Sequence, residues 1–138
     1  MTSDHAVPLS KTDFEELARF RFGIRRYLRF SEETVRKRGL TSQQYQLMLA
    51  LKGYPGKDWA TIQELAGRLQ LRHHSVVELV NRATDRALVR REPDPADARV
   101  ARVVLTASGD EILEELSEMH RDELKLIASE FRLPALGT

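Results

Sequence analysis

The sequence predicts a mainly α-helical fold with one small β-hairpin, and three observations carry this prediction. Apolar residues recur at the three- and four-residue spacing of amphipathic helices in several separate segments. Two short runs rich in Val and Leu flank a stretch with two prolines and two aspartates, which is the composition of a hairpin turn. The length of 138 residues suits a modest core, so we expect a single domain over residues 1–138.

The hairpin is expected to have strands at 88–92 and 99–105, with a polar turn between them. In the second strand, alternation lets the end near Leu105 pack on a core while the end at Arg99 projects into solvent. Asp97 lies two residues before Arg99, close enough for its carboxylate to cap the turn or to pair with the guanidinium. Taken alone, this pattern fits an ordinary solvated hairpin equally well.

Two short helices are expected immediately before the hairpin. Thr61 and Glu64 have the spacing of a capping box, in which both side chains bond free N–H groups, so a short helix begins at Thr61. A second helix follows from about Arg72 to Arg86, with an apolar stripe made by Val76, Leu79, Val80, Ala83 and Ala87. Two helices followed by a basic hairpin form a helix-turn-helix with a wing, a shape that grips a nucleic-acid duplex.

The face opposite that stripe predicts how the second helix would contact DNA. A bland surface helix usually carries more Glu and Lys, whereas the N-terminal half of this one offers hydrogen-bond donors, one acceptor and a small apolar side chain. Phosphate contacts are expected from Arg72 and Arg82, and base-edge contacts from His73, His74, Ser75, Val77 and Glu78. Glu78 is the acceptor, which suits the amino group of a cytosine.

The segment with these helices and the wing resembles the winged helix-turn-helix of the MarR family of bacterial transcriptional regulators. The positions that match the family pattern are Leu69, Ser75, Val76, Leu79, Val80, Leu88, Val89, Arg91, Asp97, Arg99, Leu105, Thr106 and Gly109. With the flanking helices, the resemblance covers nearly the whole chain. It implies that Arg99 enters the minor groove, that Asp97 orients it, and that the helix beginning near Arg72 lies in the major groove.

Several positions depart from the family pattern. His73, His74 and Glu78 replace residue types that are common in the family, so the operator sequence does not follow from the resemblance. Ala87 stands where glycine is frequent, so the turn there either avoids the left-handed conformation or tolerates strain. Ala98 stands where arginine is frequent, so the wing tip has one positive charge fewer.

The two ends of the chain predict long amphipathic helices of opposite charge. Residues 19–38 hold eight basic and two acidic residues, a net charge of +6, whereas 109–131 hold eight acidic and two basic residues, a net charge of −6. The apolar stripes are Phe14, Leu17, Ile24, Leu28 and Val35 at one end, and Leu113, Leu116, His120, Leu124, Ile127 and Phe131 at the other.

The resemblance implies that these helices, over 10–38 and 109–132, interleave with those of a second copy around the DNA-binding lobe at 41–106. A merely solvated charged surface is the alternative, because surface ion pairs contribute little each. The C-terminal arm, which ends near Leu133 and Pro134, is short for the family, so a small interface is expected.

The resemblance also implies an effector pocket for a small, often aromatic, anion. The residues available for it are Phe20, Phe22, Arg26, Tyr27, Phe30 and Trp59, and all of them are equally suited to a core. For Trp59, packing against the next helix is the favoured interpretation. The middle of the chain adds a capping box at Thr41 and Gln44, which predicts a scaffold helix closed by the turn residues 53–56.

Other chemistry is not supported by the sequence. The chain has no cysteine, which excludes disulfides, cysteine–zinc sites and thiol-based sensing. His73 and His74 are adjacent on a helix and point about 100° apart, so they do not hold one metal together, and neither a metal nor a cofactor is expected. Phosphate-loop and nucleophile motifs are missing, so no enzyme is expected. Without an apolar signal or spanning segment, the expected location is cytoplasmic.

These observations predict a homodimeric, sequence-specific DNA-binding transcriptional regulator, a ligand-responsive repressor that reads an inverted repeat. The alternative is a winged-helix module that binds a protein partner and does not bind DNA. The net charge of only +1 and the acidic Glu78 on the reading helix favour that alternative.

Overall fold

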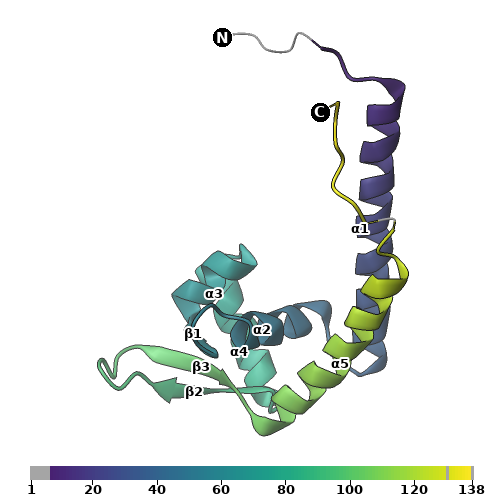
Figure 1. The fold of residues 1–138 in the computed structure, drawn as a ribbon. Helices are drawn as coiled ribbons and strands as arrows, with labels where there is room; N and C mark the ends of the chain where they lie inside the picture. The colour runs from purple at the N-terminus through teal and green to yellow at the C-terminus, as the bar shows by residue number, and fades with distance from the viewer. Residues whose placement is uncertain (1–6, 130, 138) are drawn as a thin grey trace. The chain divides into compact units, whose positions relative to one another are not determined.

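A computed structural model describes residues 7–129 and 131–137 of the chain (Figure 1). The elements are α1 (Lys11–Lys37), α2 (Ser42–Lys52), β1 (Trp59–Thr61), α3 (Ile62–Leu69), α4 (His73–Asp85), β2 (Val89–Pro93), β3 (Ala101–Leu105) and α5 (Ala107–Leu126). The predicted class, mainly α-helical with a small β-hairpin, is confirmed. The chain divides into two compact units: a terminal unit, which runs up to Glu33 and resumes at Met119, and a central unit, Thr34–Glu118.

The central unit packs its helices on one face of a small sheet. The strand order is β1-β3-β2, with antiparallel pairing that sets Ala60 opposite Val103 and Val89 opposite Leu105. Ala60, Val89 and Val103 share a face, and all three are buried. Strand β1 was not predicted, because three residues are too few to show an alternation.

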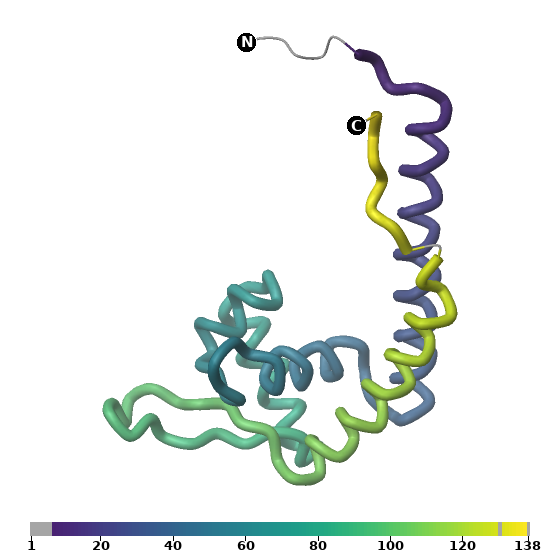
Figure 2. The backbone as a smooth tube through the Cα atoms, viewed as in Figure 1, coloured from purple at the N-terminus to yellow at the C-terminus, as the bar shows by residue number. Residues whose placement is uncertain are grey.

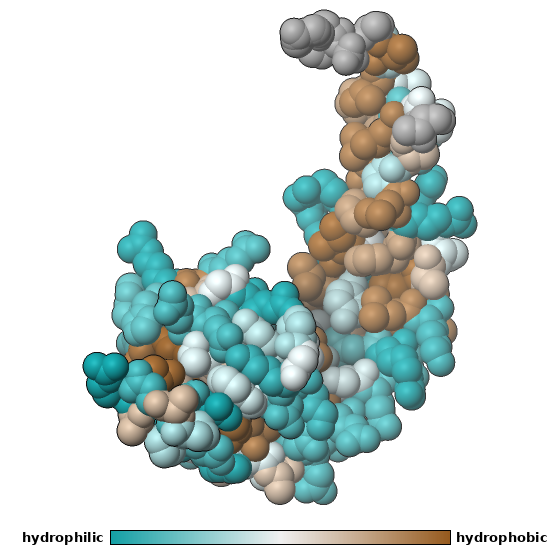
Figure 3. All heavy atoms as spheres, turned by 60° about the vertical axis from the view of Figure 1, so that its left-hand side comes forward, coloured by the Kyte–Doolittle hydropathy of each residue, from teal (hydrophilic) through white to brown (hydrophobic). Residues whose placement is uncertain are grey.

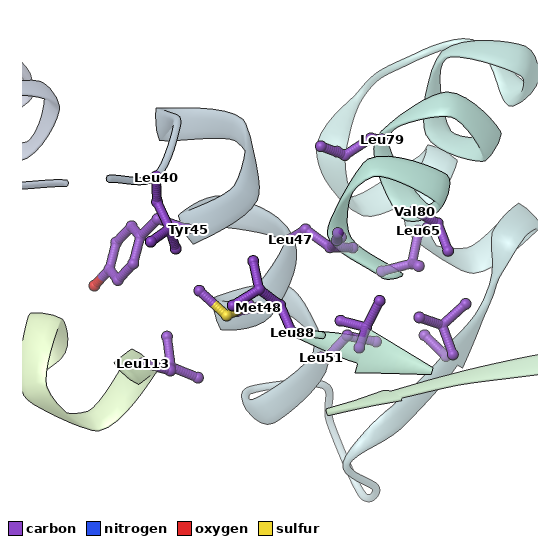
Figure 4. Packing of buried hydrophobic residues seen from close by; sticks show 14 of the residues in the cluster. Leu40, Tyr45, Leu47, Met48, Leu51, Leu65, Leu79, Val80, Leu88 and Leu113 are labelled. Carbon is purple, nitrogen blue, oxygen red and sulfur yellow. The ribbon is translucent and has the colours of Figure 1, made fainter. Parts of the chain in front are cut away.

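The core of the central unit lies between that sheet face and the helices. Figure 4 shows side chains from α2, α3 and α4 meeting there, and the fully buried ones include Leu47, Met48, Leu51, Leu65, Val76 and Val80. Each large apolar side chain buried in this way contributes about 1.5–3 kcal/mol relative to an exposed one. The amphipathic stripe predicted for α4 is therefore confirmed from Val76 to Ala83.

The helix ends explain where the elements begin. Both predicted capping boxes are present: Thr41 and Gln44 exchange hydrogen bonds at the start of α2, and Thr61 and Glu64 do so at the start of α3. A threonine cap of this kind stabilises a helix by about 1 kcal/mol. The start of both helices is therefore stabilised by contacts between residues three apart in the sequence.

The prediction that Ala87 continues the apolar stripe of α4 is wrong. Ala87 is exposed and lies beyond the helix, with φ +58°. Its N–H donates to the Thr84 carbonyl and the N–H of Leu88 donates to the Ala83 carbonyl, which is the Schellman motif that ends many helices. Of the two alternatives for this turn, the chain adopts the left-handed conformation and tolerates the strain.

The terminal unit contains most of α1, the end of α5 and the tail that follows. Helix α1 begins where it was expected, because the Ser10 N–H donates to Asp13 Oδ2 and the Asp13 N–H donates to Ser10 Oγ. The tail runs back beside α1 (Figure 2), and the Ala135 N–H donates to Glu16 Oε2 at 3.2 Å.

The boundary predicted for the last helix, at residue 132, is wrong because α5 ends at Leu126. A turn follows, in which the Phe131 N–H still bonds the Ile127 carbonyl at 3.2 Å, so the apolar spacing continues past the regular helix. Periodicity alone cannot distinguish such a turn from a helix.

Within the terminal unit, an aromatic cluster surrounds a buried histidine. The Nε2 atom of His120 lies 2.7 Å from Ser31 Oγ, and the rings of Tyr27 and Phe30 meet the imidazole edge-on with centroids 5.9 and 5.7 Å away. His120 is only 3% exposed. It is thus a buried histidine with a hydrogen-bond partner.

Candidate nucleic-acid interface

Helix α4 presents the predicted reading face to solvent. Because its opposite face is buried in the core, Arg72, His73, His74, Glu78 and Arg82 are exposed, while Ser75 and Val77 are half-buried. The first turn carries no acidic residue, and the Arg72 side chain makes no capping hydrogen bond. The positive end of the helix dipole is thus left for an anion such as a phosphate.

The wing tip presents Arg99. Its Nε and Nη2 atoms lie 3.1 and 3.2 Å from the two carboxylate oxygens of Asp97, and its backbone N–H donates to Asp97 Oδ1 at 3.1 Å. The Arg99 side chain is nevertheless 89% exposed. Both roles considered for Asp97, capping the turn and pairing with the guanidinium, are therefore present together. These bonds hold the pKa of Asp97 below its usual value, with the Arg99 side chain as the main cause.

Asp94 organises the turn that carries Arg99. Its Oδ1 atom accepts the N–H groups of Ala96 and Asp97 at 2.8 and 3.2 Å, and its Oδ2 atom accepts from Arg102 Nε at 3.0 Å. The pKa of Asp94 is lowered by the Ala96 N–H first and by Arg102 next. This network was not predicted from the sequence.

The predicted strand bounds need correction at the wing. Strand β2 is Val89–Pro93, one residue later than the predicted 88–92, and β3 begins at Ala101 rather than Arg99. The Asp94 N–H donates to the Val100 carbonyl, and the Val100 N–H donates to Asp97, so the backbone before Ala101 is used by the turn.

A further contact ties the wing to the reading helix. Arg91 Nη2 on β2 donates to Asn81 Oδ1 on α4 at 2.6 Å. The sequence signal for this contact is the alternation of side chains along a strand. Arg91 lies two residues after the buried Val89, so both side chains point to the helical side of the sheet.

The residues considered for an effector pocket are divided between the two units. In the terminal unit, Phe20 and Tyr27 both contact Phe131, with ring centroids 5.9 and 6.2 Å apart, whereas Phe22 and Arg26 are exposed. Phe30 contacts His120, as described above. Of these residues, Phe20 lines a pocket of about 600 Å³, together with Thr12, Glu16, Arg19, Ser129, Arg132, Leu133, Pro134 and Ala135.

Trp59 lies in the central unit, in β1. Its ring packs against two cationic groups, with Lys57 Nζ 3.6 Å and Arg102 Cζ 3.7 Å from the ring centroid. These contacts are with Lys57 and Arg102, so the packing of Trp59 against the next helix, α3, stays a prediction. Its ring also borders a polar pocket of about 410 Å³.

The described part of the chain offers neither a cluster of metal ligands nor a membrane-spanning helix. Within 7–129 and 131–137, no three or more His, Asp or Glu side chains are grouped so that they could hold a metal ion. None of the helices in the same residues has the length and apolar character needed to cross a membrane.

Two helices packed at the base of a three-stranded sheet, with a β2-β3 wing, define a winged helix-turn-helix protein. Residues 38–100 match the model of the MarR family. The chain is 40% identical over 74 residues to the transcriptional regulator HosA of Escherichia coli O111:H-, an alignment that covers 54% of this chain and 53% of HosA. Residues 38–100 are therefore similar to the winged helix-turn-helix of the MarR family, and the chain spans about half the length of this curated relative.

Solved structures show the same fold over most of the chain. AbsC, a MarR family transcriptional regulator from Streptomyces coelicolor, superposes with a TM-score of 0.73 at 22% identity, over 94% of this chain and 86% of AbsC. A mutant of MarR from E. coli complexed with operator DNA superposes with a TM-score of 0.61 at 20% identity, over 80% of this chain and 72% of that one. The relatives are described as transcriptional regulators, which agrees with the prediction that the chain is not an enzyme.

Proposed function

We propose that the chain is a sequence-specific DNA-binding transcriptional regulator. The observation that carries the proposal is that the central unit presents both a polar, outward-facing helix α4 and an exposed arginine at the wing tip. The first suits the major groove, where hydrogen-bond patterns distinguish the four base pairs. The second suits the narrow minor groove, where negative potential attracts arginine.

Each candidate residue has a place in this proposal. His73, His74, Ser75, Val77 and Glu78 approach base edges, and Arg72 and Arg82 contact phosphates. Arg99 enters the minor groove and Asp97 orients it through the bonds described above. That a similarly folded MarR protein has been solved with operator DNA supports this arrangement.

We propose that the working form is a homodimer that reads an inverted repeat. The terminal unit exposes many large apolar side chains, among them Phe14, Phe22, Leu28, Leu126 and Leu133 (Figure 3). Contiguous exposed apolar surface of this kind usually marks an interaction site. A second copy would cover it and would place two α4 helices on one duplex.

We also propose that the regulator is a repressor that responds to a small aromatic anion. The pocket of the terminal unit lined by Phe20 offers an aromatic ring beside Arg19 and Arg132, which suits a ring that carries a carboxylate. Benzoate is the probe for this part of the proposal. If the proposal is right, benzoate weakens operator binding by the wild type and has less effect on Arg132→Gln.

The test of DNA binding begins with selection of a target from a random duplex library, followed by fluorescence-anisotropy titration at several salt concentrations. We expect selective binding of the selected duplex over a scrambled one, with affinity that falls steeply as salt increases. Equal, weak binding of both duplexes would contradict the proposal and favour the protein-binding alternative.

Arg99→Ala tests the wing contact, and we expect it to weaken binding by about 1–3 kcal/mol, the share of a good base contact. The matched control is Arg121→Ala, which removes the same charge from α5, where Arg121 pairs with Asp122. Unchanged affinity of Arg99→Ala for a tightly bound duplex would show that the wing mechanism is wrong.

A further inference from the structure

Two shielded ion pairs flank the chain's single tryptophan. Lys57 Nζ lies 2.9 Å from both carboxylate oxygens of Glu64, and Arg102 Nε lies 3.0 Å from Asp94 Oδ2. The side chains of these pairs are only 22% and 32%, and 27% and 17%, exposed. Ion pairs with such limited access to water are screened less than fully exposed pairs.

The cations of both pairs contact the ring of Trp59. Lys57 Nζ and Arg102 Cζ lie 3.6 and 3.7 Å from the same centroid. Because two like charges repel and cannot occupy the same place, we infer that they cover opposite faces of the ring. The strand register supports this arrangement, since Trp59 pairs with Val104 while Arg102 lies one pair further along the same sheet face.

Beyond Arg102, the contacts continue into the wing turn. Asp94 accepts from Arg102 with one oxygen and holds the N–H groups of Ala96 and Asp97 with the other. Asp97 in turn holds the guanidinium and the N–H of Arg99. A continuous series of contacts therefore runs from Glu64, in the first turn of α3, to Arg99.

We propose that Trp59 and Arg102 are positioning residues that brace the wing, so that Asp94 and Asp97 hold Arg99 in the orientation in which it contacts DNA. The proposal rests on the DNA-binding function proposed above. Neither residue belongs to the predicted contact set, and the Arg102 guanidinium is already engaged by Asp94 and by the ring of Trp59. Their effect on affinity is therefore exerted through Arg99.

The contacts of Trp59 and Arg102 add stability to the wing, which a short two-stranded hairpin does not have by itself. An isolated two-stranded ribbon is marginally stable in water, and the β2-β3 hairpin extends into a turn whose bonds are largely its own. A stacked arginine loses less freedom than a free one when it forms its hydrogen bonds. An arginine presented by a fixed turn has little freedom left to lose on binding, which favours affinity.

A double-mutant cycle tests the brace. In the wild-type background, we expect Arg99→Ala to weaken binding of the selected duplex by about 5-fold to 150-fold. In an Arg102→Gln background, Arg99 is no longer held, so Arg99→Ala should weaken binding by no more than about twofold. The matched control background is Arg90→Gln, which removes the same charge from β2, where Arg90 pairs with Glu92 and has no bond to the turn. There the full Arg99→Ala effect should remain.

Hydrogen exchange of the turn provides a second measurement that does not depend on DNA. The N–H groups of Ala96 and Asp97, which Asp94 holds, should exchange about tenfold faster in Arg102→Gln than in Arg90→Gln. Trp59→Phe, which keeps a ring but weakens the cation–π contacts, should give a smaller increase in the same direction.

The outcomes separate the two proposals. A full Arg99→Ala effect in Arg102→Gln, or unchanged exchange at Ala96 and Asp97, would overturn the brace while DNA binding stands. If the wild type binds no duplex selectively, the Arg99→Ala effect is missing in every background, and both proposals fall. Loss of the effect together with faster exchange supports the brace.

Discussion

Arg99 is held by a carboxylate whose protonation should release it. The pKa of Asp97 is lowered in the folded chain, chiefly by the Arg99 side chain, so the pair contributes stability above the ordinary value of about 3.9. This contribution is lost as the pH falls through the lower, folded pKa. We therefore expect the Asp97 carboxyl carbon, followed by NMR, to titrate below the ordinary value.

In an Arg99→Gln variant, the same carbon should titrate closer to the ordinary value, because the main cause of the shift is gone. The Asp97 carboxylate and the guanidinium lie at the surface, so the effect is expected at the turn and not in global stability. Titration of wild-type Asp97 at or above about pH 3.9 would contradict the pairing.

Ala87 is a second residue whose local conformation leads to a prediction. Its φ of +58° carries a steric cost that glycine avoids, while glycine loses more entropy on folding. We expect Ala87→Gly to raise the free energy of unfolding by about 0.5–1 kcal/mol, measured by urea denaturation. Ala98→Gly is the matched control, since Ala98 is also exposed but has no positive φ. A stabilisation of the control as large as that of Ala87→Gly would show that strain is not the cause.

At the scale of the elements, Gly109 fixes how α5 begins beside the wing. A Cβ at Gly109 would collide with the carbonyl oxygen of Leu88, and Thr106 on the same turn already bonds that carbonyl through its N–H. We expect Gly109→Ala to destabilise the chain by about 1–3 kcal/mol, because backbone atoms cannot yield as a flexible side chain can. Thermal unfolding followed by circular dichroism measures the change.

The contrasting helical glycine is Gly67 in α3, where a Cβ would meet nothing within 4 Å. There the same substitution should stabilise the chain by about 0.5–1 kcal/mol, since alanine is the better helix former. Equal effects at Gly67 and Gly109 would contradict the close approach to Leu88.

The features that could be predicted from the sequence are those with a local signal. The capping boxes that begin at Thr41 and Thr61 each lie within four consecutive residues, so they can be recognised from the sequence. The apolar spacing from Val76 to Ala83 repeats often enough to define one face of α4. The spacing of Asp97 and Arg99 likewise allowed their contact to be expected, and it is present.

The features that were missed depend on partners distant in sequence. Strand β1 forms because Trp59–Thr61 pairs with β3, about forty residues later in the chain. Its three residues are too few to show an alternation of apolar and polar side chains. The stacking of Arg102 on Trp59 depends on that pairing. The sequence does not indicate which aromatic ring a basic residue in a strand will contact, so the stacking of Arg102 on Trp59 could not be predicted from it.

At the scale of the whole molecule, the exposed apolar residues of the terminal unit predict self-association. Leu28 on α1 is 56% exposed, as is Phe14 three positions further back along the predicted stripe, so apolar side chains of this face are open to solvent in one copy of the chain. If a second copy covers it, a charge introduced at Leu28 would be buried without a partner and would separate the copies.

We expect wild type to sediment as a dimer in analytical ultracentrifugation and Leu28→Glu to sediment as a monomer or a much weaker dimer. The matched control is Leu49→Glu, the same change at a leucine of α2 that is 46% exposed in the central unit, and it should leave the dimer intact.

Because an inverted repeat is read by two α4 helices at once, Leu28→Glu should also lose selective binding of the full repeat while its affinity for a half-site changes little. A monomeric wild type, or a Leu28→Glu variant as dimeric as Leu49→Glu, would show that this face does not join two copies.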